Sequence, residues 1–170
     1  FLLDALAEAQ IAILKSGQEK PELLGMGTTL LAALVNPDGT GLFMNIGDSR
    51  GHLIDGGITN TQDQNMAQML VRTGGWLTEE QAMNHPLSKR LDQALGDINP
   101  PVPDFYPIDM NGKYLLLSSD GLHGFVRKER IQEIVIDEGP SLSGKVQFLI
   151  DEALRCGSND NITVILAREE

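Results

Sequence analysis

Short apolar runs that meet an aspartate in a turn are the feature that most limits how this chain can fold. Asp120 and Asp48 each follow such a run, and Asp160 precedes a third. The three runs are residues 113–117, 42–46 and 162–167. Runs of this length are typical of buried strands, and a carboxylate at the end of a buried strand requires a partner because it is only partly solvated. The pattern therefore predicts an oxygen-rich site for a hard cation such as Mg²⁺ or Mn²⁺.

Each of these aspartates also has a simpler interpretation. An aspartate in a turn often accepts a hydrogen bond from its own backbone. For Asp48, an ion pair with Arg50 is a further alternative. The residues taken one at a time leave these alternatives open.

The composition is that of an ordinary globular protein with an acidic surface. Of the 170 residues, 41% are hydrophobic and 22% charged, and the net charge is −11, which disfavours nucleic acid and anionic membranes as partners. The single cysteine, Cys156, excludes an internal disulfide and favours a reducing, cytoplasmic compartment, where we expect it to be a small packing residue. No apolar run approaches the roughly 18 residues of a membrane span.

The first half of the chain predicts one long helix, a β-meander and several short helices. Residues 2–14 show helical apolar spacing without an N-cap or a secretory signal, and residues 15–21 are expected to form a loop. Strands at 27–35, 40–46 and 51–54 are joined by short turns and therefore predict one antiparallel meander. A helix ending at Gly74-Gly75 and a capping box from Thr78 to Gln81 follow, with the second helix expected to end at Asn84.

The second half predicts strands at 105–108, 113–117 and 162–167 and helices at 128–137 and 141–155. The last helix carries an expected apolar stripe of Val146, Leu149, Ile150 and Leu154. Meanders with separate helices indicate the α+β class, and the length suits a single domain.

Four motifs in order resemble those of the metal-dependent protein serine/threonine phosphatases, protein phosphatase type 2C, in a bacterial form. They are Gly25-Met26-Gly27-Thr28-Thr29, Gly47-Asp48-Ser49-Arg50, Ser119-Asp120-Gly121 and Asp160-Asn161. The resemblance covers nearly the whole chain. It implies two antiparallel β-sheets packed as a sandwich, with helices on the outer faces in a four-layer α-β-β-α order. Residues 1–170 would form one phosphatase domain, with a flap at about 64–95 beside the metal centre.

The resemblance also implies a metal centre. Asp120 and Asp160 would be ligands of two Mn²⁺ or Mg²⁺ ions, and Asp48 would help to hold a third, weaker ion. The family's bridging aspartate lies in an Asp-Gly-x-Gly-Gly segment, which this sequence does not contain. Its catalytic histidine and phosphate-binding arginine lie in the same upstream part. We therefore expect no catalytic residue and incomplete N-terminal strands within these residues, and weak activity if they are isolated.

Two positions depart from the family pattern near the third metal. Gln64 follows Asp63 where relatives carry histidine, and Lys89 stands where relatives usually carry serine or asparagine. A lysine close to a metal site would repel the ion by like charge.

Several other residues have a structural and a functional interpretation. His123 is either a proton donor near pH 7 or, as we expect, an exposed loop histidine. His52 is expected to be a half-exposed sheet residue, His85 a helix-boundary residue and Trp76 an anchor of the flap.

The predicted function is hydrolysis of phosphoserine and phosphothreonine monoesters in proteins by a metal-activated water. The alternative is a non-catalytic regulatory or interaction module that kept the fold. The implied partners are phosphorylated proteins, with a serine/threonine kinase and its targets as further candidates.

Overall fold

The computed structural model describes residues 1–83 and 85–169, and the chain forms two compact units. The helical unit comprises Phe1–Leu30, Ile46–Asp48 and Asp63–Asp104. The sandwich unit comprises Leu31–Asn45, Ser49–Gln62 and Phe105–Glu170. The chain passes between the units several times, so neither is a continuous stretch of sequence.

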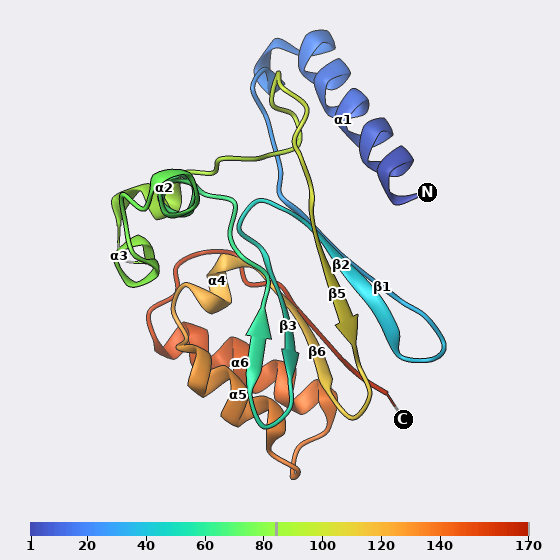
Figure 1. Ribbon diagram of the computed structural model, residues 1–170, viewed down its shortest axis with the longest axis vertical. Coiled ribbons are helices and arrows are strands. Elements are labelled where there is room, and N and C mark those ends of the chain that lie inside the picture. Colours follow the sequence, from blue (N-terminus) through green and yellow to red (C-terminus); the bar gives the residue numbers. More distant parts are fainter. Residues whose placement is uncertain (84, 170) are drawn as a thin grey trace. The chain divides into compact units, whose positions relative to one another are not determined.

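Two sheets form the centre of the sandwich unit (Figure 1). The three-stranded sheet has the order β1-β2-β5, with β1 at Leu30–Val35, β2 at Thr40–Ile46 and β5 at Asp104–Asp109. The four-stranded sheet has the order β4-β3-β6-β7, with β3 at Arg50–Ile54, β4 at Ile58–Asn60, β6 at Tyr114–Ser118 and β7 at Val164–Arg168. The neighbouring strands of the four-stranded sheet are antiparallel. This confirms the predicted α+β class with two antiparallel sheets.

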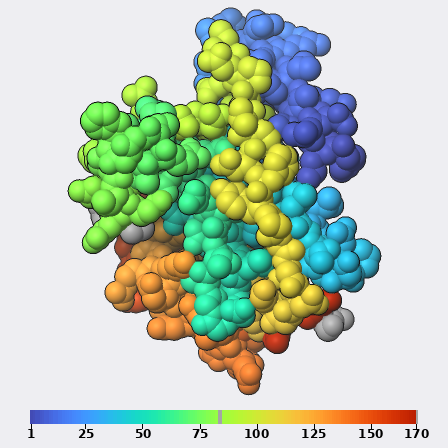
Figure 2. All heavy atoms as spheres, in the orientation of Figure 1, coloured from blue at the N-terminus to red at the C-terminus, as the bar shows by residue number. Residues whose placement is uncertain are grey.

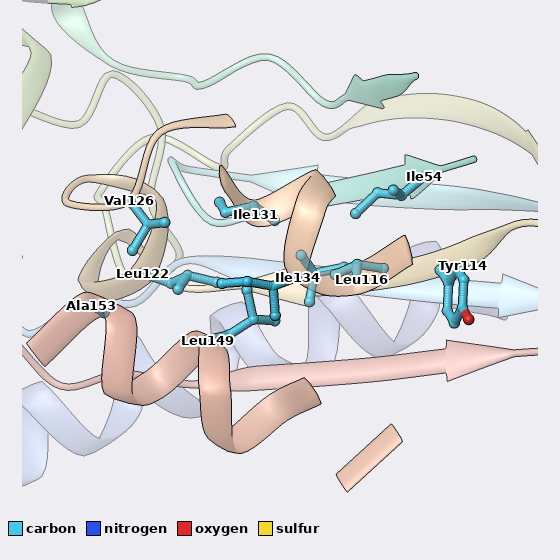
Figure 3. Close-up of a cluster of buried hydrophobic side chains, with 10 residues drawn as sticks. Ile54, Tyr114, Leu116, Leu122, Val126, Ile131, Ile134, Leu149 and Ala153 are labelled. Carbon is cyan, nitrogen blue, oxygen red and sulfur yellow. The ribbon is translucent and has the colours of Figure 1, made fainter. Parts of the chain in front are cut away.

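Apolar side chains fill both faces of the four-stranded sheet. One face packs against α4 (Asp120–His123), α5 (Lys128–Ile136) and α6 (Leu142–Arg155), through a cluster that includes Leu116, Leu122 and Leu149 (Figure 3). The other face packs against the three-stranded sheet through Phe43 and Leu115 among others. Alternation along the strands sends successive side chains to opposite faces, so β6 supplies both clusters. The unit is therefore a helix–sheet–sheet sandwich.

The helical unit contains α1 (Leu2–Glu19), α2 (Met66–Gly74), α3 (Glu79–Met83) and two short 3₁₀ turns, η1 (Pro21–Leu23) and η2 (Pro86–Lys89). The predicted capping box is confirmed: Gln81 N donates to Thr78 Oγ1 at 3.2 Å, and Thr78 N donates to Gln81 Oε1 at 2.9 Å. Helix α2 ends before Gly75, whose φ of 62° lies in the left-handed region. The predicted end of the next helix, Asn84, lies outside the described residues.

Two predictions about the first half are wrong. The expected loop at 15–21 is mostly helix, because α1 continues to Glu19 with Gly17 buried on its inner side. The expected meander is split, because β2 belongs to one sheet and β3 to the other. Gly47, with a φ of 96°, lies between them, and this backbone conformation ends the first strand.

Only part of the apolar stripe predicted for the last helix is buried: Leu149 is fully buried, and Val146 and Ile150 are half-buried. Ala153 is also fully buried, whereas Leu154 is 57% exposed. Cys156 is also exposed, so it is not a packing residue. Within the described ranges, the helices include none with the length and hydropathy needed to cross a membrane.

Candidate metal centre

Asp120 and Asp160 lie in two turns at the same end of the four-stranded sheet. Strand β6 ends at Ser118, and Asp120 is the first residue of α4. Asp160 lies four residues before Val164, where β7 begins. Because Ser118 is opposite Val164 in the antiparallel register, the two turns are neighbours.

Hydrogen bonds on both sides of the aspartates join these turns. Ser119 N donates to Thr163 O at 3.1 Å, and Thr163 N donates to Ser119 Oγ at 3.0 Å. Ser119 Oγ in turn donates to Asn161 O at 3.2 Å. On the other side, Ser158 Oγ donates to Gly121 O at 2.8 Å. The immediate neighbours of Asp120 therefore bond residues one to three positions from Asp160.

Gly121 allows this close approach. A Cβ at this position would lie 2.3 Å from Asn161 O, which no real side chain tolerates. The glycine of the Ser-Asp-Gly motif is thus required by packing between the turns rather than by its own φ, because no positive φ occurs at this residue.

Both carboxylates are exposed and can reach a cation from solvent. Asp160 Oδ1 accepts a hydrogen bond from Asn161 N at 2.7 Å, so part of the turn interpretation holds for this residue. An ionised carboxylate offers about four lone-pair sites, and one such bond leaves capacity for a cation. Over residues 1–83 and 85–169, no group of three or more His, Cys, Asp or Glu side chains is arranged to hold a metal. Asp120 and Asp160 therefore supply part of a coordination shell.

Asp48 belongs to the helical unit, where Gln64 holds its turn. Gln64 is 2% exposed, and its Oε1 accepts from Gly47 N at 3.0 Å while its own N donates to Gly47 O at 2.8 Å. Its Nε2 donates to Val102 O at 3.1 Å and to Asp104 Oδ2 at 2.9 Å. Gln64 therefore fixes the backbone before Asp48 through its Oε1 and its N–H, and its Nε2 ties this turn to residues 102–104. Sequence reasoning missed this role.

Two other residues near this turn in sequence have defined environments. Asp63 is half-buried and accepts from Asn65 Nδ2 at 3.3 Å, whereas Lys89 is exposed at the end of η2. The third metal site at Asp48 remains a prediction.

The histidines differ from expectation in two of three cases. His52 is 2% exposed rather than half-exposed; it lies on β3, which is paired on one side with β4 and on the other with β6. Burial, with smaller contributions from the charges of Arg50 and Lys128, lowers the pKa of His52 to about 3. His123 is half-buried and hydrogen-bonded rather than exposed. His85 is the boundary residue predicted, since its Nδ1 accepts from Leu87 N at 3.2 Å before η2.

Trp76 is 78% exposed, and its role as an anchor of the flap stays a prediction. The segment around it, coloured green, lies at the molecular surface in the space-filling view (Figure 2).

Known proteins that resemble the chain are bacterial phosphatases, although no protein-family model matches it. The serine/threonine phosphatase stp of Listeria monocytogenes is 34% identical over 173 aligned positions, covering 100% of this chain and 68% of that protein. The structure of serine/threonine phosphatase Stp1 from Staphylococcus aureus gives a TM-score of 0.90 at 34% identity, covering 99% of this chain and 66% of that one. The catalytic domain of the serine/threonine protein phosphatase PstP, in complex with two manganese ions, gives 0.75 at 36% identity, covering 92% and 65%. The chain spans about two thirds of the length of these relatives.

The sandwich fold and these relatives together define a phosphoprotein phosphatase. The chain belongs to the bacterial serine/threonine protein phosphatases of type 2C, as its four ordered motifs predict. The enzyme prediction is thereby confirmed, and the alternative of a non-catalytic module is not favoured.

Proposed function

We propose that Asp120 and Asp160 bind Mn²⁺ or Mg²⁺ in a protein that hydrolyses phosphoserine and phosphothreonine monoesters. The observation that carries this proposal is the hydrogen-bonded pair of turns, which presents two exposed carboxylates at one end of a rigid sheet. The manganese complex of PstP supports the identity of the ions. Asp48 is the candidate for a third ion.

The residues present fit a hard divalent cation. Both side chains supply carboxylate oxygens, which Mg²⁺ and Mn²⁺ prefer, and Mg²⁺ is commonly held by one or two carboxylates with waters completing the shell. The two turns are fixed by the Ser119 and Ser158 hydroxyls, so little backbone reorganisation is needed on binding. The negative charges of two carboxylates on neighbouring turns also favour a cation.

In the reaction, the proposed role of these residues is to bind the metal ion and to orient its ligands. A divalent ion bound at such a site lowers the pKa of a coordinated water and offsets charge on the phosphoryl oxygens. Asp120 and Asp160 hold the ion, and Ser119, Ser158 and Asn161 hold the two aspartates in register. The substrates would be phosphorylated proteins, and a serine/threonine kinase acting on the same targets is the corresponding partner.

A calorimetric Mn²⁺ titration of the full-length protein tests the proposal. We expect Asp120→Asn and Asp160→Asn each to weaken Mn²⁺ binding sharply and to abolish hydrolysis of a phosphothreonine peptide. Asp151→Asn on α6 is the matched control, since Asp151 is exposed and bonds only Gln147 within its own helix at 2.9 Å among its described hydrogen bonds. Parent-like affinity in both ligand variants, or activity that persists in EDTA, would exclude this metal site.

A further inference from the structure

Three polar side chains form a continuous series of hydrogen bonds next to the Asp120 turn. His52 Nε2 lies 3.1 Å from Ser118 Oγ, and Ser118 Oγ lies 2.8 Å from His123 Nδ1. His52 and Ser118 are 2% and 3% exposed, and the two imidazole rings meet edge to face with centroids 6.3 Å apart. The three residues come from β3, β6 and α4, so these hydrogen bonds link a strand at the centre of the sheet to the helix that begins at Asp120.

The direction of the hydrogen bonds follows from the protons available. A hydroxyl carries one hydrogen, so Ser118 donates to one imidazole and accepts from the other. Within the described part of the chain, Nδ1 of His52 is buried without a hydrogen-bond partner. Buried N–H groups without an acceptor are rarer than under-satisfied acceptors. His52 therefore carries its proton on Nε2 and donates to Ser118, and Ser118 donates to Nδ1 of His123.

Competing arrangements are weaker. Arg50 O, another acceptor near Ser118 Oγ, lies 3.5 Å away, which is long for an O–H···O bond. Protonation of His52 is opposed by its burial and by the positive charges of Arg50 and Lys128. The neutral, one-directional series of hydrogen bonds is thus the stable state of the three side chains.

The hydrogen bond between Ser118 and His123 brackets Asp120. These two residues lie before and after the segment 119–122, which leaves the strand and starts α4. The Ser118–His123 bond joins the two ends of this segment. The bonds of Ser119 and Ser158 join the segment to the turn that contains Asp160. Rotation of the Asp120 turn would break either the Ser118–His123 hydrogen bond or the hydrogen bonds of Ser119 and Ser158.

We propose that His52, Ser118 and His123 are positioning residues that hold Asp120 in its metal-binding orientation, with Nδ1 of His123 as the required acceptor. The inference rests on the proposed role of Asp120 as a metal ligand. It assigns a function to two histidines that the family motifs do not include.

Mn²⁺ titrations of full-length variants test this inference. Loss of a direct hydrogen-bond partner of a metal ligand typically costs 10–100-fold in affinity. Ser118 and His123 act on the segment that carries Asp120, so we expect Ser118→Ala and His123→Leu to raise the Mn²⁺ dissociation constant by roughly tenfold, the lower end of this range. His123→Asn is the conservative variant, because its amide oxygen can accept in place of Nδ1, and its affinity should stay close to that of the parent. Ser16→Ala is the matched control, since that hydroxyl bonds Ala12 O within α1 at 2.9 Å.

A spectroscopic measurement separates positioning from simple packing. Imidazole ¹⁵N chemical shifts should show the Nε2–H tautomer for both His52 and His123 in the folded parent. Because this measurement uses the parent protein, it does not depend on whether the variants fold. The opposite tautomers would overturn the inference. Loss of affinity in His123→Asn equal to that in His123→Leu would also overturn it, because packing would then explain both.

The Asp120→Asn variant distinguishes the two proposals. If Asp120→Asn weakens Mn²⁺ binding and Ser118→Ala does not, the positioning inference fails and the metal site stands. If Asp120→Asn binds Mn²⁺ as the parent does, the metal site itself fails.

Discussion

Ser119 and Thr163 hold each other through two hydrogen bonds, one from each backbone N–H, at 3.1 and 3.0 Å. The pairing continues the antiparallel ladder of β6 and β7 beyond the last paired strand residues, with the Ser119 hydroxyl replacing a backbone carbonyl. It therefore sets the spacing of the turns that carry Asp120 and Asp160.

Removing this hydroxyl should weaken metal binding more than it weakens the fold. We expect Ser119→Ala to lower Mn²⁺ affinity by roughly tenfold, as for other outer partners of metal ligands, and to reduce the unfolding free energy by about 1 kcal/mol for the lost hydrogen bonds. Calorimetric titration and urea unfolding measure the two effects. Ser143→Ala, at an exposed position near the start of α6, should change neither; unchanged affinity in Ser119→Ala would contradict the role of the pairing.

Gly121 should tolerate no larger residue. In Gly121→Ala the new methyl group meets Asn161 O at 2.3 Å, so the turns must separate. Overpacking of this kind costs about 1–3 kcal/mol, and we expect a comparable loss of unfolding free energy together with weaker Mn²⁺ binding. Gly56→Ala is the control, because a Cβ there meets no atom within 4 Å. Equal stability of the two variants would show that the turns approach less closely than described.

Acid should destabilise the protein through His52. The pKa of His52 is about 3 in the folded protein, below its ordinary value of 6.5, because burial disfavours the imidazolium. Between these two pH values, His52 therefore binds a proton in the unfolded chain but not in the folded one. The stabilisation is complete well above pH 6.5 and is lost progressively as the pH falls through 6.5 toward 3.

Urea unfolding at a series of pH values measures this effect. We expect His52→Leu to flatten the dependence between pH 6.5 and 4.5, whatever its stability at neutral pH. Glu152 contributes at lower pH: Arg155 and Arg130, hydrogen-bonded to its carboxylate, lower its pKa to about 2, so its stabilisation is lost as the pH falls from 4.5 toward 2. The same slope in parent and His52→Leu above pH 4.5 would rule out His52 as its source.

The parts of the fold that were predicted correctly are those set by local chemistry. The Thr78–Gln81 capping box and the Gly75 helix end depend on residues within one helical turn, and sequence shows these directly. The Asp120 and Asp160 turns were found because a strand and a turn residue adjoin in sequence. Local pattern does not show which sheet a strand joins, so the transfer of the chain from one sheet to the other around Gly47 was missed.

Buried polar residues were missed for a related reason. Lys145 is 2% exposed because its ammonium group caps the carbonyls of Val135 and Asp137 at the end of α5. His52 is buried with its Nε2 hydrogen-bonded to Ser118, which lies 66 positions away in the sequence. In both cases the satisfying groups come from another element, and polarity alone predicts exposure.

Gln64 should be replaceable only by a residue that both donates and accepts. Gln64→Glu removes the donors to Val102 O and Asp104 and places a second carboxylate beside Asp104. An unsatisfied buried group costs about 1–3 kcal/mol, and we expect at least this loss of unfolding free energy. Gln81→Glu is the matched control, because Glu serves equally in a capping box. A Gln64→Glu variant as stable as this control would contradict the described hydrogen bonds.

Metal binding should be visible as added stability. A ligand that binds only the folded state stabilises it by about 2.7 kcal/mol at a concentration 100 times its dissociation constant. We therefore expect Mn²⁺ to raise the melting temperature of the full-length parent, and EDTA to reverse the rise. In Asp160→Asn the rise should be small, while the metal-free variant should be at least as stable as the metal-free parent, because one of two neighbouring exposed carboxylates has lost its charge. Differential scanning calorimetry with and without Mn²⁺ measures both quantities in one protein sample. A rise in Asp160→Asn as large as that in the parent would place the stabilising ion away from this residue.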